Sequence, residues 1–348
     1  MRKIVPAVLM ALLCGARAGA INLHELNGSD LGMGVGARAI GMAGAFTALA
    51  DDAAALYWNP AGITEMPRRE AMFMVDMDPT RYSYKALVFR PKSWDDSELR
   101  PTFGIARTNR LKYVGEGKWW EGNAGHLVDL SMISLDWKTY DGGLNSRTND
   151  WRVTFASRVP RAEKLSIGMT YIDFKCVTTF YATNSGRTCQ IVSYETMDFG
   201  LLYRAGPSRS VGLSLRNPLE KTKPKYLNLG YARRKGNSIL TLDVERIFGN
   251  YSHEMRTADF LMVRAGAERD LKNGWKLRGG MLIPLRAKTS TLGDIYSRIP
   301  SPKVDIALGA GYEYKNYIVD FAVYGDPGRG YVNKELKAGS VLTMRYRF

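Results

Sequence analysis

The sequence predicts an all-β fold, a transmembrane antiparallel β-barrel of about 14 strands, preceded by an N-terminal segment rich in small residues. Three observations predict it. From about Thr80 onward, apolar and polar residues alternate with a period of two. No apolar run after residue 20 is long enough to span a bilayer as a helix. The final strand presents aromatic side chains on one face and basic side chains on the other.

Residues 1–20 have the pattern of a signal peptide. Arg2 and Lys3 precede an apolar run from Ile4 to Leu13, and the small residues that follow fit a cleavage site near Ala20. The chain is therefore expected to be exported. The formal net charge of +15 falls by three when the signal is removed, and a basic balance outside the cytoplasm favours lipid headgroups or other anionic ligands over nucleic acid.

Residues 70–348 are expected to form the barrel. In the last strand, Leu342, Met344, Tyr346 and Phe348 alternate with polar or basic residues, and similar alternation recurs upstream, for example at residues 261–268, 275–285, 304–314 and 317–324. Very short connections at Asn237 and Asn273-Gly274 indicate periplasmic turns. Longer connections are expected near residues 109–125, 137–151, 176–189 and 289–302, and these would face outward.

Alternation alone would also fit a soluble β-sandwich, so other features must separate the two folds. So many strands would make an unusually large sandwich, and aromatic residues near strand ends are typical of an interfacial girdle: Trp275, Tyr312, Tyr314, Tyr324 and Tyr346. Outer-membrane barrels resemble one another in ending on an aromatic residue that the barrel-insertion machinery reads. That resemblance implies an insertion signal at Met344, Tyr346 and Phe348, a multi-pass location in a bacterial outer membrane, and contact with its lipids.

Charged residues alternate onto the inward faces of the strands. They are Arg216, Asp243, Glu245, Arg264, Glu268, Lys276, Arg278, Asp305, Glu313, Asp320, Arg345 and Arg347. Two interpretations stay open. These residues could form ion-pair networks that hold a narrow barrel, or they could line a basic path that attracts a fatty-acid carboxylate.

Residues 21–69 differ from the rest of the chain because they are dominated by glycine, alanine and other small residues. We expect a short helix within residues 36–50 and a second helical stretch from Asp51-Asp52 to Tyr57, which Pro60 ends. The two acidic residues are interpreted as a helix start rather than a calcium site. The motif at residues 34–39 matches a dinucleotide-binding fingerprint, but it lacks the preceding strand and following long helix.

The run from Gly36 to Asp52, followed by Tyr57-Trp58-Asn59-Pro60-Ala61-Gly62, resembles the start of the PorV/PorQ group within the FadL-like outer-membrane superfamily. In that superfamily the N-terminal segment folds into the barrel mouth as a hatch. The resemblance implies that the hatch spans residues 21–69 and that the ligand path passes Gly41, Gly44, Asn59, Pro60, Ala61 and Gly62. The chain is short for such a transporter, so its outer loops are expected to be reduced.

Cys176 and Cys189 are the two cysteines left after removal of the signal, and both lie in an export compartment where disulfides persist. They flank residues 177–188, which contain Asn184-Ser185-Gly186 and are interpreted as a hairpin loop. A disulfide across this loop is expected, with two free thiols as the alternative.

The sequence carries no pattern that indicates an enzyme, a cofactor site or a metal site. The three histidines, His24, His126 and His253, have no metal-binding spacing, and no serine, histidine and carboxylate set stands out. The resemblance implies transport of hydrophobic small molecules such as long-chain fatty acids. A PorV-like, non-enzymatic component of a protein-secretion system is the second hypothesis, and a general porin is a third, which the hatch argues against.

Overall fold

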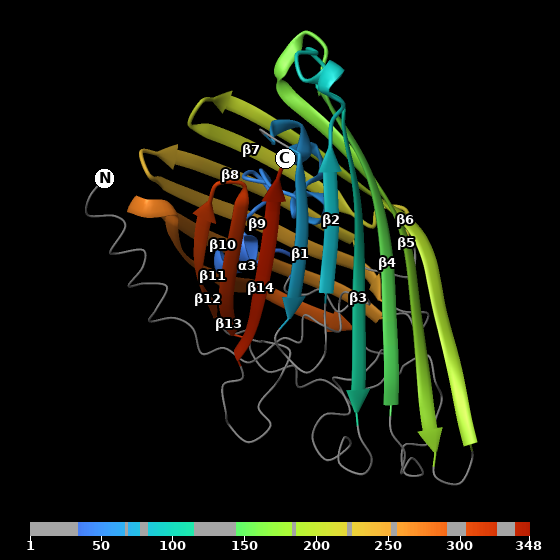
Figure 1. The fold of residues 1–348 in the computed structure, drawn as a ribbon. Coiled ribbons are helices and arrows are strands. Elements are labelled where there is room, and N and C mark those ends of the chain that lie inside the picture. Colours follow the sequence, from blue (N-terminus) through green and yellow to red (C-terminus); the bar gives the residue numbers. More distant parts are fainter. Residues whose placement is uncertain are drawn as a thin grey trace.

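The computed structural model describes residues 34–66, 69–76, 83–114, 144–182, 186–220, 225–251, 256–290, 304–325 and 338–348. Within these ranges, fourteen antiparallel strands form a closed barrel, shown in Figure 1. Each strand pairs with its neighbours in sequence, and β1 pairs with β14 from Glu70↔Arg347 to Asp76↔Val341. The predicted fold class and strand number are confirmed.

The strands are β1 (Glu70–Asp76), β2 (Ser83–Phe89), β3 (Thr102–Val114), β4 (Leu144–Val159), β5 (Ala162–Ala182), β6 (Gly186–Gly206), β7 (Arg209–Arg216), β8 (Lys225–Lys235), β9 (Ser238–Tyr251), β10 (Arg256–Asp270), β11 (Trp275–Ser290), β12 (Asp305–Tyr314), β13 (Tyr317–Gly325) and β14 (Ala338–Arg347). Short 3-10 helices lie in two connections, η2 (Lys92–Trp94) and η6 (Lys272–Gly274). Among the described residues, no helix is both long and apolar enough to cross a membrane.

Short turns gather at one end of the barrel, which we call the turn end; the opposite end is the loop end. Residues 160–161, 207–208, 236–237 and 315–316 each join two strands there, and the chain ends on the same side (Figure 1). Asn273 and Gly274 both have positive φ, 62° and 83°, which explains the choice of these residue types in the tight connection before β11.

Strands β4, β5 and β6 are longer than the sequence pattern predicted. In two of the expected loops, residues 137–151 and 176–189, the described residues 144–151, 176–182 and 186–189 are strand, because β4 begins at Leu144, β5 continues to Ala182 and β6 begins at Gly186. The β-branched and aromatic residues from Val177 to Tyr181 favour an extended conformation, and the expectation of a loop gave them too little weight. In Figure 1 these strands extend far toward the loop end.

The backbone register of β5 and β6 bears on the two cysteines. Cys176 pairs with Val192, whereas Cys189 pairs with Thr179, three positions further along β5. A disulfide needs Cα atoms within about 7 Å of each other, so it would require a different local register. The bond stays a prediction, and intact mass with and without reduction tests it.

The outward face of the barrel is a broad apolar surface. Exposed side chains on strands around the barrel include Val153, Leu229, Leu242, Leu277 and Ile306. Met344, Tyr346 and Phe348 also face outward, with exposed fractions of 51%, 39% and 48%. This is the surface that a lipid-facing barrel requires.

The predicted aromatic girdle needs one correction. Trp275, Tyr312, Tyr314 and Tyr346 lie on the outer face as expected, but Tyr324 is only 7% exposed. The period of two places Tyr324 on the inward face together with Asp320 and Ala322, and its ring lies within van der Waals distance of Gly339 on β14.

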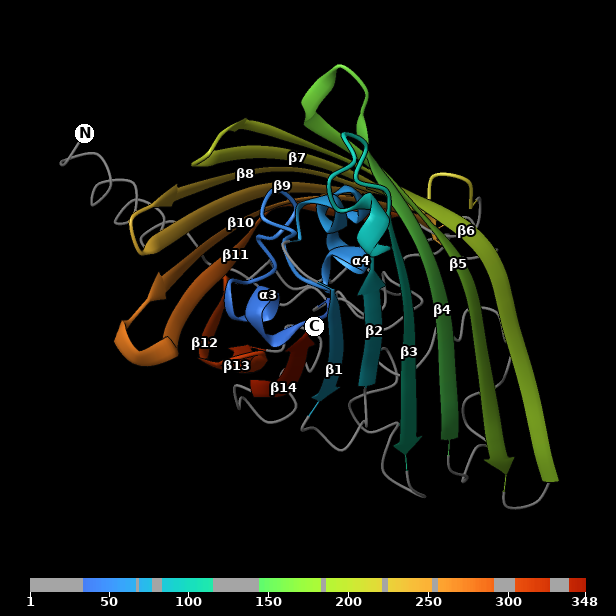
Figure 2. The same ribbon diagram turned by 45° about the horizontal axis from the view of Figure 1, so that its top comes forward.

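Residues 34–66, which we call the inner segment, lie inside the barrel (Figure 2). They form α3 (Ala37–Gly41), α4 (Ala55–Trp58) and the 3-10 helix η1 (Pro60–Glu65). Nearly every side chain in this segment is buried. Residues 1–33, which contain the predicted signal and the start of the predicted hatch, lie outside the described residues.

The helices of the inner segment are shorter than predicted. Within residues 36–50 only α3 is helical, because Ala43, Gly44 and Ala50 adopt positive φ values of 54°, 75° and 31° and reverse the chain. The second helix, α4, begins at Ala55 rather than at Asp51, and it ends before Pro60 as expected. Pro60 then opens η1, where its missing N–H costs nothing.

Candidate functional site

The backbone of the inner segment lies directly on glycines of the barrel wall. A Cβ atom at any of these glycines would overlap the inner segment or approach it closely, and we call the set the glycine belt: Gly104, Gly168, Gly200, Gly212, Gly230, Gly266, Gly280 and Gly309. Six of these glycines form three directly opposite pairs on adjacent strands, namely Gly168↔Gly200, Gly212↔Gly230 and Gly266↔Gly280. The belt lets backbone approach backbone around most of the barrel.

Gly41 and Gly44, two of the predicted path residues, are packing positions in this structure. The Cα of Gly41 faces Gly309 of β12, and a Cβ there would lie 3.1 Å from the Gly309 Cα. Gly44 has a φ of 75° and lies between the Trp58 ring and the Arg264 guanidinium. Both glycines are needed for close approach, whatever passes through the barrel.

The other four predicted residues, Asn59 to Gly62, lie together against β5 and β6. The Asn59 amide donates to the carbonyl oxygens of Thr47 (2.8 Å) and Leu201 (2.9 Å), and its Oδ1 accepts from the Ala61 N–H. Pro60 and Ala61 rest on Gly168 and Gly200, and Gly62 lies against Ala50. Asn59 therefore ties two parts of the inner segment to the wall.

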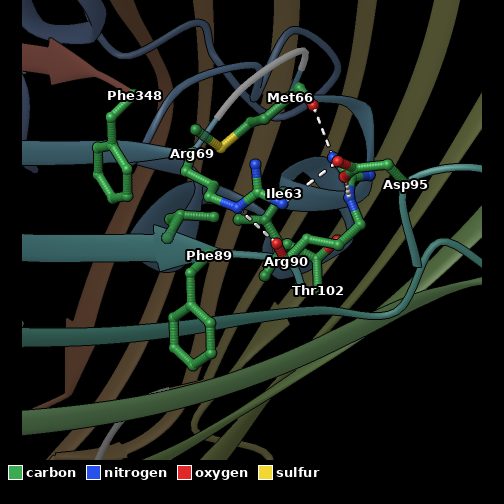
Figure 3. A pocket seen from close by; sticks show the side chains of 9 residues that line it. Ile63, Met66, Arg69, Phe89, Arg90, Asp95, Thr102 and Phe348 are labelled. Atoms are coloured by element: carbon green, nitrogen blue, oxygen red, sulfur yellow. Dashed lines mark hydrogen bonds and ion pairs between the residues drawn. The ribbon is translucent and has the colours of Figure 1, made fainter. Parts of the chain in front are cut away.

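A pocket lies beside η1 at the turn end, and Figure 3 shows its lining. None of the six predicted path residues lines it. Ile63 and Met66 of the inner segment do, together with Arg69 just before β1, residues of β2 and the β2–β3 connection, Thr102 at the start of β3, and Phe348. Whether the six residues form a ligand path stays a prediction.

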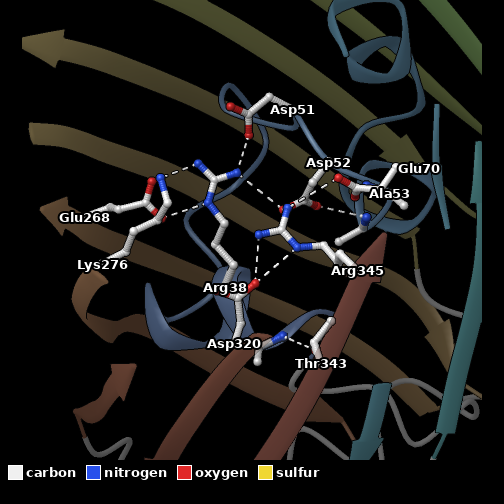
Figure 4. Close-up of polar contacts among 12 residues, drawn as sticks. Arg38, Asp51, Asp52, Ala53, Glu70, Glu268, Lys276, Asp320, Thr343 and Arg345 are labelled. Carbon is white, nitrogen blue, oxygen red and sulfur yellow. Dashed lines mark hydrogen bonds and ion pairs between the residues drawn. The ribbon is translucent and has the colours of Figure 1, made fainter. Parts of the chain in front are cut away.

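Arg38 of α3 is the centre of a buried charge network, drawn in Figure 4. Its Nε and Nη2 donate to the two carboxylate oxygens of Glu268 at 2.8 and 2.9 Å, a bidentate pair. Its Nη1 donates to Asp51 at 2.6 Å and to Asp52 at 3.3 Å. Each nitrogen of the Arg38 guanidinium therefore donates to a carboxylate, so this buried cation is fully paired.

The network closes into a ring of three arginines and three carboxylates with alternating charge. Arg38 pairs with Glu268, and the ring continues through Arg278, Asp320, Arg345 and Asp52 back to Arg38. Each of the six side chains is less than 10% exposed. The inner segment supplies Arg38 and Asp52, while β10, β11, β13 and β14 supply the other four. The ring is electrically neutral, which is how so many charges tolerate burial.

Asp51 extends the ring to β8. Its two oxygens accept from Arg38 and from Arg234, the latter at 2.7 Å. Burial alone would raise the pKa of Asp51, but the charges and hydrogen bonds of Arg38 and Arg234 outweigh burial and hold that pKa well below its ordinary value. The main role of Asp51 and Asp52 is therefore to pair with arginines. Their expected role at the start of a helix is minor, since of their four carboxylate oxygens only the Asp52 Oδ1 accepts from a backbone N–H next to α4, that of Ala54.

A second group of charges surrounds the aromatic residues of α4. Glu245 pairs with Arg264 at 2.6 Å and with Arg216 at 2.7 Å. The Arg216 guanidinium lies 5.0 Å from the centre of the Tyr57 ring, and that of Arg264 lies 5.9 Å from the Trp58 ring. The Arg264 Nη1 also donates to the Ala43 carbonyl.

Of the two interpretations of the inward charges, ion pairing describes what the structure shows for ten of them: Arg216, Glu245, Arg264, Glu268, Lys276, Arg278, Glu313, Asp320, Arg345 and Arg347. Asp243 instead accepts from the Thr47 N–H at 2.8 Å. Sequence reasoning missed Arg38 and the pair Asp150 and Arg152. A single arginine in a run of alanines and glycines was the available signal for Arg38.

An apolar cluster faces inward on the loop side of these charges. It comprises Tyr226, Ile247, Phe260, Met262 and Leu282 on the adjacent strands β8 to β11, and Ala43 of the inner segment packs against it. Every member is less than 5% exposed. This part of the wall is chemically suited to apolar molecules.

Within the described part of the chain, no three histidine, cysteine or acidic side chains are placed to hold a metal ion. The expected absence of enzymatic, cofactor and metal chemistry stays a prediction for the whole chain.

The fold and interior define a class: closed fourteen-stranded barrels whose lumen holds a folded N-terminal segment. Solved structures similar to this chain are the Pseudomonas putida toluene transporter TodX (12% identity, 91% of this chain and 99% of that chain, TM-score 0.60), the CymD monoaromatic hydrocarbon channel (13%, 91% and 98%, 0.60) and a Pseudomonas aeruginosa FadL homologue (11%, 95% and 100%, 0.59). No family model and no curated protein matches the sequence. The FadL-like fold is confirmed; the PorV branch stays a prediction.

Proposed function

We propose that this protein carries hydrophobic small molecules across a bacterial outer membrane, with the inner segment as a hatch that gates the lumen. The apolar cluster on β8 to β11 carries the proposal, because it lies on the inward face and packs against Ala43 of the inner segment, so movement of the inner segment would uncover it. The similar structures are by name a toluene transporter, a monoaromatic hydrocarbon channel and a FadL homologue, which supports the same class of cargo.

Polar contacts join the inner segment to the wall in addition to its apolar packing against the strands, and such contacts suit a hatch. Ion pairs and hydrogen bonds can exchange for water or for a ligand, whereas a purely apolar plug would resist leaving. Such contacts join the inner segment to β5, β6, β7 and β9 through Thr64–Ser166, Asn59–Leu201, Ser210–Ala48 and Thr47–Asp243.

Uptake by cells that lack their own hydrophobe transporters tests the proposal. We expect expression of the chain to increase uptake of labelled oleate or toluene, and Phe260→Arg to reduce that increase because it places a charge in the apolar cluster. Arg246→Gln, on the exposed outer face, is the matched control. Barrel closure in each variant is checked by heat-modifiable migration on gels. Equal uptake with and without the chain would contradict transport.

Deletion of residues 21–66 tests the hatch separately. An open barrel should conduct ions in planar bilayers, and the intact protein should conduct little. Wild-type transport together with unchanged conductance after the deletion would contradict a gating hatch. Co-purification of a large partner would instead favour the PorV-like secretion component expected from the sequence.

A further inference from the structure

The pocket beside η1 combines cationic and apolar lining. Arg69, Arg90, Asp95 and Thr102 form its polar side, and Ile63, Met66, Val88, Phe89 and Phe348 form its apolar side. Phe89 and Phe348 are 40% and 48% exposed on the outer face, so the pocket lies at the turn-end rim of the barrel, where the apolar surface ends. Figure 3 shows the two arginines between these rings and Asp95.

The two arginines share a single carboxylate. The Arg69 Nη2 and the Arg90 Nε each lie 3.2 Å from an oxygen of Asp95, whose side chain is 45% exposed in the β2–β3 connection. The Nη1 of Arg69 has no hydrogen-bond partner among the described residues, whereas Arg90 also donates to the carbonyls of Thr64 and Met66. The lining side chains thus carry one excess positive charge and a free donor.

The cavity has a volume of about 60 Å³. A single water needs roughly 10–15 Å³ of such volume, so the cavity holds about four waters, which is the size of a carboxylate or phosphate group. An acyl chain would not fit inside, but it would lie along Phe89 and Phe348 on the lipid-facing surface.

We propose that this rim pocket binds the anionic head group of an acyl-chain amphiphile, either a fatty-acid carboxylate or a phospholipid phosphate. Arg69 supplies the free donor, Arg90 supplies charge, and the outward phenylalanines contact the chain. Asp95 occupies the position that bridges both arginines and, being exposed, is readily displaced. The site is separate from the apolar cluster in the lumen, so it does not depend on the proposed transport.

Binding to the full chain, purified in a non-ionic detergent, tests this proposal by native mass spectrometry. Oleate and dioleoyl phosphatidylglycerol are the two anionic probes, and methyl oleate is the neutral one. We expect at least one anionic probe to bind saturably in a way that Arg69→Gln weakens, and methyl oleate to show no binding that depends on Arg69; the better anionic probe identifies the source of the anion. Arg69→Gln should weaken that binding about tenfold.

Two variants control for charge and folding. Arg233→Gln removes an exposed charge from the turn end of β8 and should leave binding unchanged, and Arg69→Lys should retain part of it. The proposal is overturned if Arg69→Gln weakens binding of methyl oleate as much as binding of oleate, if Arg233→Gln weakens binding as much as Arg69→Gln does, or if neither anionic probe saturates. Uptake assays report on the lumen instead, so a failure of transport would leave this result unaffected.

Discussion

Arg38 and Glu268 lie 230 residues apart in the chain and form a bidentate ion pair inside the barrel. Arg38 belongs to the inner segment and Glu268 to β10, so this pair joins the two parts of the molecule. Through Arg278 and Asp52 the same pair belongs to the closed ring of six charges.

Replacing Arg38 should release the inner segment. Arg38→Met leaves Glu268, Asp51 and Asp52 buried with one cation fewer, and breaking a buried pair in this way costs about 3–5 kcal/mol. We expect faster amide hydrogen exchange in peptides covering residues 34–66 and unchanged exchange in the strands. Arg246→Met, which breaks an exposed pair with Asp259, is the control. Unchanged protection of the inner segment in Arg38→Met would show that the ring does not hold it.

Acid should loosen the inner segment through Asp51. The pKa of Asp51 in the folded protein lies below its ordinary value, so its stabilisation is fully present above about pH 4 and is lost as the pH falls further. A tenfold change in the proton affinity of this carboxyl corresponds to about 1.4 kcal/mol. The protection of residues 34–66 against hydrogen exchange should therefore fall as the pH is lowered from about 4 toward 2.

Asp51→Asn separates this effect from general acid damage. The variant should show less protection of the inner segment at pH 7 and a smaller change between about pH 4 and pH 2. Asp259→Asn, on the outer face, should follow the wild type. If Asp51→Asn shows the same acid response as the wild type, another group is responsible.

Gly200 tests the glycine belt. Its α-carbon faces Asn59 and Pro60, and a side chain there would overlap both. Gly200→Val should displace the inner segment and raise conductance, since overpacking costs about 1–3 kcal/mol while valine favours the strand itself. Gly206→Val, in the same strand, should behave as the wild type, because a Cβ at Gly206 would meet no other atom within 4 Å. Equal conductance of the two variants would argue against the belt.

The sequence predicted which face each strand residue occupies, because a period of two needs only local information. Glu268, Arg278, Asp320 and Arg345 were placed inward on this basis, and all four are buried. Their partners were not predictable, since Arg278 and Asp320 meet only when strand registers across the barrel are known. The role of Arg38 was missed for the same reason.

Asn59 tests whether a side-chain amide keeps the inner segment attached to the wall, because Asn59→Asp replaces only its nitrogen by oxygen. Its amide nitrogen donates to the carbonyls of Thr47 and Leu201, and both acceptors are backbone groups that cannot move away independently. Asn59→Asp keeps the shape of the side chain but replaces the donor by a carboxylate oxygen, which then faces both carbonyl oxygens without a hydrogen bond. Each buried group left unsatisfied costs about 1–3 kcal/mol, so the hatch should open more often.

Single-channel recordings should show longer or more frequent openings than in the wild type. Asn237→Asp, in an exposed turn between β8 and β9, should not. If the openings of Asn59→Asp match those of the wild type, the link from Asn59 to β6 does not keep the hatch closed.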